Sequence, residues 1–226
     1  MLTLEMIQDA QKALKGIARK TPLDAAPKIG ENIYIKAENL QLTGAFKLRG
    51  AYNKIRSLTK EEADRGVIAC SAGNHAQGIA LSATKLGIKS IICMPAGAPI
   101  SKVEATKNYG AEVVLVPGVY DDAAREADRL AKEHGYTFAH PFGLEILEQL
   151  PEVDQVVCPI GGGGLISGIA LAIKSLKPSC KVIGVQAATV PSMYESCKAG
   201  KITPVPDGET LADGIHVLTP GNMTFE

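Results

Sequence analysis

The chain has no excess of charge of either sign, because 24 lysine and arginine residues balance 24 aspartate and glutamate residues. Without a net field, a protein does not attract nucleic acid or an anionic membrane over its whole surface. We therefore expect neither as a partner. Hydrophobic residues make up 46% of the 226 residues, which is ample for a buried core.

The sequence also lacks paired cysteines. Its five cysteines are odd in number, and none belongs to a Cys-x-x-Cys motif. A disulfide framework or a zinc site is therefore not expected. We predict reduced, mostly buried thiols, as is typical of a cytosolic protein. These residues are Cys70, Cys93, Cys158, Cys180 and Cys197.

No stretch has the pattern of a membrane anchor or a secretory signal. The uncharged run from Val156 to Ile173 is long enough to cross a bilayer, but Pro159 and four consecutive glycines disfavour one continuous helix. Residues 1–7 contain an acid and no basic segment before an apolar one, unlike a signal peptide. We expect a cytoplasmic protein without a membrane partner.

Hydrophobic periodicity predicts helices and strands that alternate along most of the chain. We expect a first helix over residues 4–18 and a half-buried strand in which Ile33, Ile35 and Ala37 face one way. Further strands are expected at 67–70, 90–94, 113–116, 137–139, 156–158 and 182–185, and helices at 74–86, from 101, at 121–134, 143–150 and 165–176. Strands separated by helices form parallel sheets through crossover connections.

The predicted fold class is therefore α/β, with two open, mainly parallel sheet modules that carry helices on both faces. A second series of elements begins at Gly143, so we expect the smaller module to be inserted in the larger. We assign residues 1–49 and 141–226 to the larger domain and residues 50–140 to the smaller.

One lysine lies at a predicted helix start. Leu48, Ala51, Tyr52 and Ile55 have the spacing of one helix face, which places Lys47 at the N-terminus of that helix. The helix dipole disfavours a cation there by a few tenths to ~1 kcal/mol. Lys47 is thus either a solvated surface lysine or an amine whose neutral form has a use, such as attack on a carbonyl carbon.

A run of glycines, Gly161–Gly164, lies between a predicted buried strand and a helix. Its backbone N–H groups could converge on a phosphate at the helix N-terminus, or the glycines could serve tight packing, and both interpretations stay open. The dinucleotide fingerprint Gly-x-Gly-x-x-Gly/Ala fails, because its last position falls on Ile166 or Ser167. The sequence contains no Gly-x-x-x-x-Gly-Lys-Ser/Thr motif, so a P-loop is excluded.

The stretch Ser71–Gly78 is a second strand-to-helix turn that is rich in small residues and donors. Asn74 and His75 lie in the first turn of the following helix, where a carboxylate could bind. The alternative is a capped helix start with a packing glycine and a solvated histidine. The remaining histidines are expected to be structural or solvated, and they are His134, His140 and His216.

Together these three stretches resemble the signature of the fold-type II pyridoxal-phosphate enzymes, and among them the threonine dehydratases (threonine ammonia-lyases). The likeness rests on the order and spacing of Ala45–Gly50, Ser71–Gly78 and Gly161–Leu165. It implies that Lys47 holds pyridoxal 5′-phosphate as a Schiff base, Asn74 hydrogen-bonds the ring 3′-oxygen and the glycine run holds the phosphate. The implied cofactor-binding residues are Phe46, Lys47, Asn74, Gly161, Gly162, Gly163, Gly164 and Leu165.

The resemblance also implies an activity, the conversion of L-threonine to 2-oxobutanoate and ammonia and of L-serine to pyruvate and ammonia. Ser71, Asn74 and His75 would bind the substrate carboxylate, Thr43 would be a substrate-binding residue near the same site, and Lys47 would be the catalytic base. The cofactor would supply the electron sink. The implied assembly is a homo-oligomer, either a dimer or a tetramer, with a small amino acid as its substrate.

Two alternatives stay open, namely serine racemase or another β-elimination or β-replacement enzyme of this fold, and a catalytically impaired fragment. Similar racemases carry a second serine where this chain has Ala72, and a methyl group cannot transfer a proton. Racemisation is therefore disfavoured. Those racemases also bind a divalent cation through carboxylates, whereas residues 186–192 contain none here, so we expect no metal.

The chain departs from the family in two places. Relatives have an acidic, glycine-containing loop between the segments that correspond to His140–Phe142 and Gly143–Glu145, which abut here. Relatives also continue beyond the position of Glu226, to a serine that meets the pyridine nitrogen. We therefore expect either a fragment or a reduced protein.

Overall fold

The computed structural model describes residues 2–71, 73–118 and 142–225. Contacts between Cα atoms divide the chain into two compact units, which are unit 1, formed by Met1–Lys12 and Ala139–Glu226, and unit 2, formed by Ala13–Phe138. Residues 13–49, which the sequence-based division assigns to the larger domain, group with unit 2, and the sequence-based boundaries stay a prediction.

Several expectations lie outside the described residues. They concern the helix at 121–134, the strand at 137–139, Ala72, His134 and His140.

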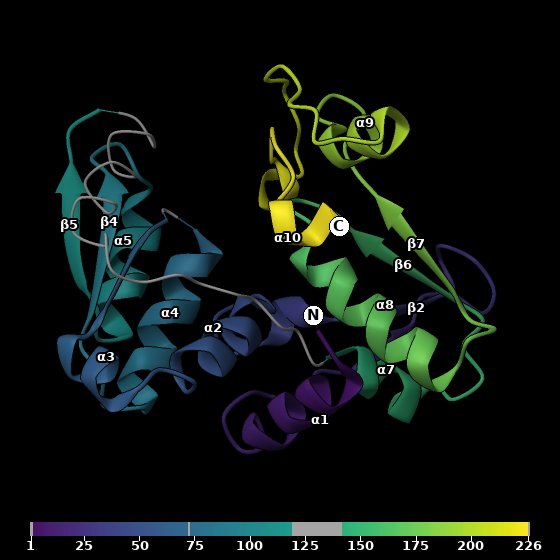
Figure 1. The fold of residues 1–226 in the computed structure, drawn as a ribbon, viewed down its shortest axis with the longest axis horizontal. Coiled ribbons are helices and arrows are strands. Elements are labelled where there is room, and N and C mark those ends of the chain that lie inside the picture. Colours follow the sequence, from purple (N-terminus) through teal and green to yellow (C-terminus); the bar gives the residue numbers. More distant parts are fainter. Residues whose placement is uncertain (1, 72, 119–141, 226) are drawn as a thin grey trace. The chain divides into compact units, whose positions relative to one another are not determined.

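Unit 2 contains a three-stranded parallel sheet with connecting helices. Its elements are β3 (Val67–Cys70), α4 (Asn74–Lys85), β4 (Ser90–Pro95), α5 (Ile100–Asn108) and β5 (Glu112–Val116). The strand order is β3-β4-β5, and the register pairs Val67 with Ser90 and Ile91 with Glu112. Helices α4 and α5 form the crossovers that parallel neighbours require (Figure 1). The predicted alternation of strands and helices is confirmed over this region.

The core of unit 2 combines small residues on α4 with larger ones on β4. Ala76, Ala80 and Ala83 on the helix are fully buried, as are Ile92 and Met94 on the strand. Alanines let the helix approach the sheet closely, so the apolar strand residues lose their contact with water. The first turns of α4 and α5 are thereby held at the carboxyl ends of β3 and β4.

Helix α2 (Lys47–Ile55) begins at Lys47, as the sequence predicts, and packs against α4. Leu48, Ala51 and Ile55 are 0%, 2% and 3% exposed, which confirms the predicted apolar face. A short helix that the sequence analysis does not predict, α3 (Lys60–Arg65), follows α2 and begins with a capping box.

The predicted half-buried strand forms, but it is exposed. Strand β2 (Tyr34–Lys36) pairs in antiparallel fashion with β1 (Leu23–Ala25). Ile33 and Ile35 are 40% and 47% exposed, so their predicted burial is wrong, whereas Ala37 on the same predicted face is buried. The two strands have only three residues each, and a two-stranded ribbon of this size has no further strand or helix of its own to cover its faces. The 3₁₀ helix η1 (Glu38–Leu40) then leads toward α2.

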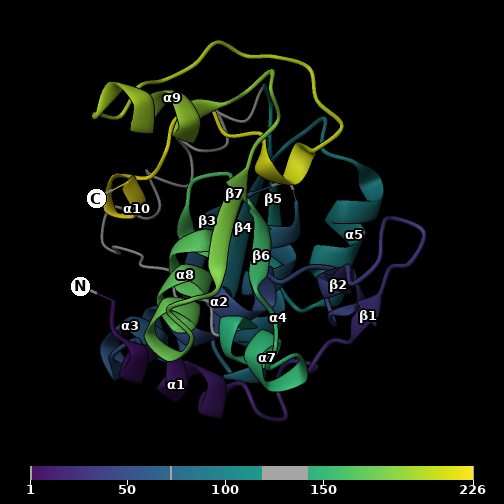
Figure 2. The same cartoon turned by 90° about the vertical axis from the view of Figure 1, so that its right-hand side faces the viewer.

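Unit 1 contains a two-stranded parallel sheet, against which one helix packs (Figures 1 and 2). Its elements are α1 (Leu4–Ala13), α7 (Phe142–Gln149), β6 (Gln155–Pro159), α8 (Gly164–Leu176), β7 (Lys181–Val185), α9 (Ser192–Ala199), η2 (Asp213–Ile215) and α10 (Asn222–Phe225). Helix α8 contacts both strands and also α7. Ile7, Leu144 and Ala172 form a buried cluster between α1, α7 and α8.

The first helix is shorter than the predicted span of residues 4–18, since α1 begins at Leu4 and ends at Ala13. Gly16 has a φ of +78°, which is incompatible with a continued right-handed helix. The uncharged run at residues 156–173 is likewise divided between β6 and α8. No helix in the described part of the chain is long and apolar enough to cross a membrane.

All five cysteines are free thiols, as predicted. Cys93, Cys158 and Cys180 are buried, whereas Cys197 is exposed. Burial raises the pKa of Cys158 to about 12, so this thiol stays protonated at neutral pH.

Candidate functional site

Lys47 occupies the first position of α2 and is partly buried. No side chain caps this helix, because Phe46 at its N-cap position offers none. The Lys47 Nζ atom lies 5.1 Å from the centroid of the Phe46 ring, and no described carboxylate forms an ion pair with it. Burial lowers the pKa of Lys47, because leaving water disfavours the charged form. Lys47 is therefore not the solvated surface lysine of the alternative interpretation.

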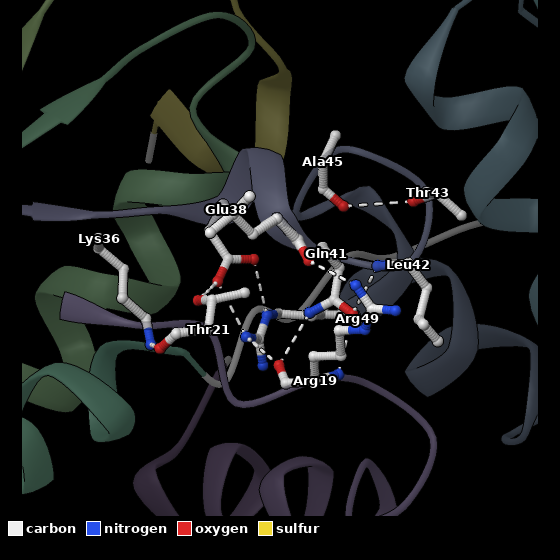
Figure 3. A network of polar contacts seen from close by, with 10 residues as sticks. Arg19, Thr21, Lys36, Glu38, Gln41, Leu42, Thr43, Ala45 and Arg49 are labelled. Carbon is white, nitrogen blue, oxygen red and sulfur yellow. Dashed lines mark hydrogen bonds and ion pairs between the residues drawn. The ribbon is translucent and has the colours of Figure 1, made fainter. Parts of the chain in front are cut away.

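A buried ion pair fixes the chain on both sides of Lys47 (Figure 3). Arg49 is 1% exposed, and its guanidinium donates to both carboxylate oxygens of Glu38, at 2.9 Å from Nε and 2.9 Å from Nη2. The same Nη2 donates to the backbone carbonyl of Arg19 at 3.0 Å. Two parallel N–H donors of a planar guanidinium match the two oxygens of a carboxylate in geometry as well as in charge.

A buried amide joins the next part of the loop to the same network (Figure 3). Gln41 accepts from the backbone N–H groups of Arg19 and Leu42, at 2.9 Å and 3.0 Å, and donates to the Arg19 carbonyl at 2.9 Å. The hydroxyl of Thr43 is buried and donates to the carbonyl of Ala45 at 3.3 Å. The predicted substrate residue Thr43 thus lies in a loop whose backbone is held by side chains.

Sequence reasoning did not identify Glu38 and Arg49 as part of this site. They lie 11 residues apart, with a loop between them, so no helix or strand spacing relates them. The resemblance to a known family included Arg49 in a motif but assigned it no role. The sequence does contain a hint of this pair. Arg49 is a charged residue beside the apolar positions of α2, and Glu38 is a carboxylate in the segment that precedes the helix.

Helix α4 approaches the start of α2 so closely that a side chain at position 78 would press on the backbone of α2. A Cβ atom at Gly78 would lie 3.0 Å from the Lys47 carbonyl carbon and 3.1 Å from both the Leu48 nitrogen and the Lys47 oxygen. These are backbone atoms, which cannot rotate away. Two stretches that the sequence analysis singled out, around Lys47 and around Gly78, are therefore in direct contact.

The turn that follows β3 presents several polar groups at the carboxyl end of the sheet. The Ser71 hydroxyl oxygen accepts from the Gly73 N–H at 3.3 Å, which leaves its own proton for another acceptor. The Asn74 Oδ1 atom accepts from Lys102 Nζ at 3.2 Å. No side chain caps α4, so the predicted alternative of a capped helix start is wrong.

His75 lies in the first turn of α4 and is neutral at physiological pH. Burial, and to a smaller extent the positive charge of Lys47, lowers the pKa of His75 to about 4. A solvated histidine would keep a pKa near 6.5, so this alternative is wrong for His75.

In unit 1, the glycine run forms the turn between β6 and α8. Gly163 is the N-cap of α8 with a φ of +97°, and no side chain caps this helix. The first N–H groups of a helix lack partners within the helix, so they can bind an anion. A Cβ atom at Gly163 would lie 2.7 Å from Thr224 Oγ1, and one at Gly161 would lie 3.0 Å from Val217 Cγ2. These two glycines thus serve packing, which is one of the two interpretations left open.

A segment near residue 224 holds the orientation of this turn. The carbonyl oxygen of Gly162 accepts from the Gly221 N–H at 3.1 Å and also from the Thr224 hydroxyl. All described peptide bonds are trans, so the N–H of Gly163 points opposite to that carbonyl. The N–H of Gly163 is therefore directed away from residues 221–224. Thr224 was not identified by sequence reasoning, because it is 62 residues away from its partner.

The predicted site residues are distributed over both units. Unit 2 contains Thr43, Phe46, Lys47, Ser71, Asn74 and His75, and unit 1 contains Gly161, Gly162, Gly163, Gly164 and Leu165. The residues in each unit fit pyridoxal 5′-phosphate, since unit 2 offers an amine with a lowered pKa and unit 1 offers an uncapped helix N-terminus for a phosphate.

Comparisons with known proteins agree with this chemistry. The model of the family described as pyridoxal-phosphate dependent enzyme matches residues 14–226. The L-threonine ammonia-lyase of Thermotoga maritima is 50% identical, over all of this chain and 60% of that protein. The L-threonine dehydratase catabolic TdcB of Escherichia coli (strain K12) is 45% identical, over all of this chain and 73% of that protein.

Solved structures of the same kind match the fold. The processed form of threonine deaminase isoform 2 from Solanum lycopersicum has a TM-score of 0.90 at 37% identity, over 98% of this chain and 69% of that chain. Maize serine racemase also has a TM-score of 0.90, at 35% identity, over 99% of this chain and 72% of that chain.

The chain spans about 60% of the length of the first curated relatives that it matches. The alignment with the Thermotoga maritima protein runs over 242 positions, 16 more than the 226 residues of this chain. The relative therefore has residues that this chain lacks. That some of them form a loop after the position of Phe142 stays a prediction. A family match over residues 14–226 and relatives that are 45% and 50% identical show that this chain belongs to the family of pyridoxal-phosphate dependent enzymes.

Proposed function

We propose that this chain carries the chemistry of a threonine dehydratase, which converts L-threonine to 2-oxobutanoate and ammonia and L-serine to pyruvate and ammonia. The observation that carries the proposal is Lys47. It is an amine with a lowered pKa, without a described carboxylate partner, whose backbone lies against Gly78 of helix α4. The names of the relatives, L-threonine ammonia-lyase and L-threonine dehydratase, support this choice of reaction.

The proposed cofactor residues follow from the chemistry of each group. Lys47 Nζ would bond to the aldehyde carbon, with Phe46 beside it, and the Asn74 amide would donate to the ring 3′-oxygen. The phosphate would bind to backbone N–H groups of Gly161–Gly164 and Leu165 at the start of α8. When bound, the cofactor supplies an electron sink for the negative charge that develops at Cα of the amino acid.

The proposed substrate residues act on the carboxylate and on one proton. Ser71, Asn74 and His75, with Thr43 nearby in sequence to Lys47, would donate hydrogen bonds to the carboxylate. Neutral His75 can donate one N–H without adding a charge, which its lowered pKa of about 4 supports. Lys47 Nζ would take the proton from Cα, and transfer of this kind typically contributes ~10²–10⁴-fold to the rate.

Serine racemase is the second candidate, because maize serine racemase matches the fold with a TM-score of 0.90. The residue at position 72 argues against it. Ala72 carries only a methyl group, which cannot serve as an acid or a base on the second face of Cα. A binding module without catalysis is the third candidate.

The experiment is an assay of the full chain with pyridoxal 5′-phosphate and L-threonine or L-serine. We expect release of 2-oxoacid and ammonia, and visible absorption of the bound cofactor. Lys47→Ala should abolish both, whereas Lys54→Ala, on the same helix, should leave both unchanged. A product mixture dominated by D-serine would favour the racemase, and absorption without any turnover would favour the binding module. Unchanged absorption and turnover in Lys47→Ala would refute the proposed role of this lysine.

We further propose a cytoplasmic homo-oligomer, either a dimer or a tetramer. Five free thiols support a reducing compartment. The assembly is suggested by family resemblance alone, and light scattering of the purified chain would measure it.

A further inference from the structure

Lys102 joins the first turns of two helices in unit 2. Its Nζ atom lies 3.2 Å from Asn74 Oδ1, so α5 contributes a cation to the residue that opens α4. Helix α4 follows β3 and α5 follows β4, and these strands are parallel neighbours. The contact therefore lies at the carboxyl end of the sheet, close in the chain to Ser71 and His75.

The chemistry of the two groups determines how the amide of Asn74 must be oriented. A lysine ammonium has three donors and no acceptor, whereas an asparagine amide has one acceptor oxygen and one donor nitrogen. Only the oxygen can face Lys102, whichever way the amide atoms are assigned. Nδ2 must then face away from Lys102, and it offers donors only.

We propose that Lys102 is a positioning residue that keeps Asn74 as a donor toward the cofactor. This inference rests on the proposed function, in which the Asn74 amide donates to the ring 3′-oxygen. Without Lys102, rotation about the last side-chain bond could present Oδ1 to that oxygen, and two acceptors would then meet. Lys102 itself touches neither the substrate nor the cofactor in this proposal.

A purely structural role for Lys102 would be to tie α5 to α4, and the core makes this role redundant. Val103, the next residue on α5, belongs to the same buried cluster as Ala76 and Ala80 of α4. Apolar packing already holds the two helices together, so the Lys102 side chain is free to act on the amide.

The chain offers a matched control on the same helix. Lys107 is also a lysine of α5, but it forms an exposed ion pair with Glu104 at 3.1 Å. Lys102→Met and Lys107→Met therefore remove the same charge from one helix, and only the first removes the contact with Asn74. Lys102→Arg keeps a group that can only donate.

The experiment measures the affinity for pyridoxal 5′-phosphate and the visible spectrum of the bound cofactor at one pH. We expect Lys102→Met to weaken affinity about 3- to 10-fold, as for loss of one hydrogen bond, and to shift the spectrum. Lys102→Arg should restore most of both, and Lys107→Met should match the wild type. If Lys102→Met does not fold, Lys102→Gln serves instead, with the smaller loss expected of a side chain that can also accept.

A double-mutant cycle tests whether Lys102 acts through Asn74. Lys102→Met should change neither the spectrum nor the affinity further once Asn74→Ala is present. The inference is overturned if Lys102→Met matches Lys107→Met, or if its effect is the same in both backgrounds. A wild-type chain that takes up no cofactor would instead contradict the proposed function, and this inference would fall with it.

Discussion

Gly78 gives the clearest case of a single residue that controls the position of the proposed catalytic lysine. Its missing side chain leaves room for the backbone of Lys47, and any Cβ atom there would meet main-chain atoms at 3.0–3.1 Å. The glycine is thus required by a close approach between α2 and α4, not by its backbone conformation.

We predict that Gly78→Ala displaces the start of α2 by a few tenths of an ångström. Overpacking of this kind costs ~1–3 kcal/mol of unfolding free energy. Because the displaced residue is Lys47, cofactor affinity should fall as well. Urea unfolding and cofactor titration would measure the two effects. Gly97→Ala is the control, since a Cβ atom at Gly97 has nothing within 4 Å, and an equal effect of both substitutions would contradict the prediction.

His75 predicts a pH dependence of stability. Its pKa is lowered from 6.5 to about 4 in the folded chain, so below pH 6.5 the unfolded chain binds a proton that the folded chain does not. The free energy of unfolding should therefore fall as the pH decreases from about 6.5 to about 4, by at most about 3 kcal/mol. Above pH 6.5 this contribution is fully present.

His75→Gln should remove that part of the acid sensitivity, and urea unfolding of the cofactor-free chain at pH 7.5 and pH 5 would measure it. His216→Gln is the control, because His216 is more exposed and lies beside Asp207. If His75→Gln and the wild type lose the same stability between these two pH values, the neutral state of the partly buried His75 is refuted.

At the scale of elements, the structure depends on side chains that bond to the backbone of distant segments. The pair Arg49 and Glu38 connects α2 to η1 and to the chain near Arg19, and Thr224 connects α10 to the turn before α8. Each contact fixes a segment that contains a predicted site residue.

We predict that Arg49→Met destabilises unit 2 strongly, because it removes the cation from the Glu38 carboxylate, whose side chain is only 11% exposed. Removing one partner of such a pair typically costs ~3–5 kcal/mol, whereas an exposed pair contributes ~0–1 kcal/mol. Lys107→Met, which breaks the exposed pair with Glu104, is therefore the control in urea unfolding. Replacing Glu38 with leucine in the Arg49→Met variant should recover part of the loss. A loss no larger than that of Lys107→Met would contradict the role of Arg49.

We predict that Thr224→Val weakens phosphate binding at the glycine turn. The variant loses the hydroxyl that donates to the Gly162 carbonyl, so the Gly163 N–H is held less firmly. Affinity for pyridoxal 5′-phosphate should fall about 3- to 10-fold, as for one hydrogen bond, and Thr224→Ser should keep it. Pyridoxal, which has no phosphate, shows whether the effect depends on the phosphate. If Thr224→Val weakens the binding of pyridoxal as much as that of pyridoxal 5′-phosphate, Thr224 does not act through the phosphate.

At the scale of the whole molecule, the parts that the sequence predicts are those with a local pattern. The alternation of strands and helices over residues 67–116 and 155–185 was predictable, because parallel strands and their crossover helices have distinct periods. The start of α2 at Lys47 was predictable for the same reason. The strand beside Ile33 and Ile35 forms, but the predicted burial of these two side chains is wrong, because alternation shows which residues share a face but not whether anything covers it.

The parts that could not be predicted depend on contacts between distant residues. Glu38 and Arg49 are separated by a loop, and Gly162 and Thr224 by 62 residues. The close approach of Gly78 to Lys47 depends on how two helices pack. The family resemblance implies the roles that we propose for Lys47 and Asn74, whereas the residues that contact them could be found only in the structure.

The most direct test of the central claim is to find the amine that bonds to the cofactor. The chain would be loaded with pyridoxal 5′-phosphate, reduced with sodium borohydride, digested and mapped by mass spectrometry. We predict one phosphopyridoxyl group per chain, on Lys47, and none in Lys47→Ala. A label on another lysine, or no label on a chain that has taken up the cofactor, would contradict it.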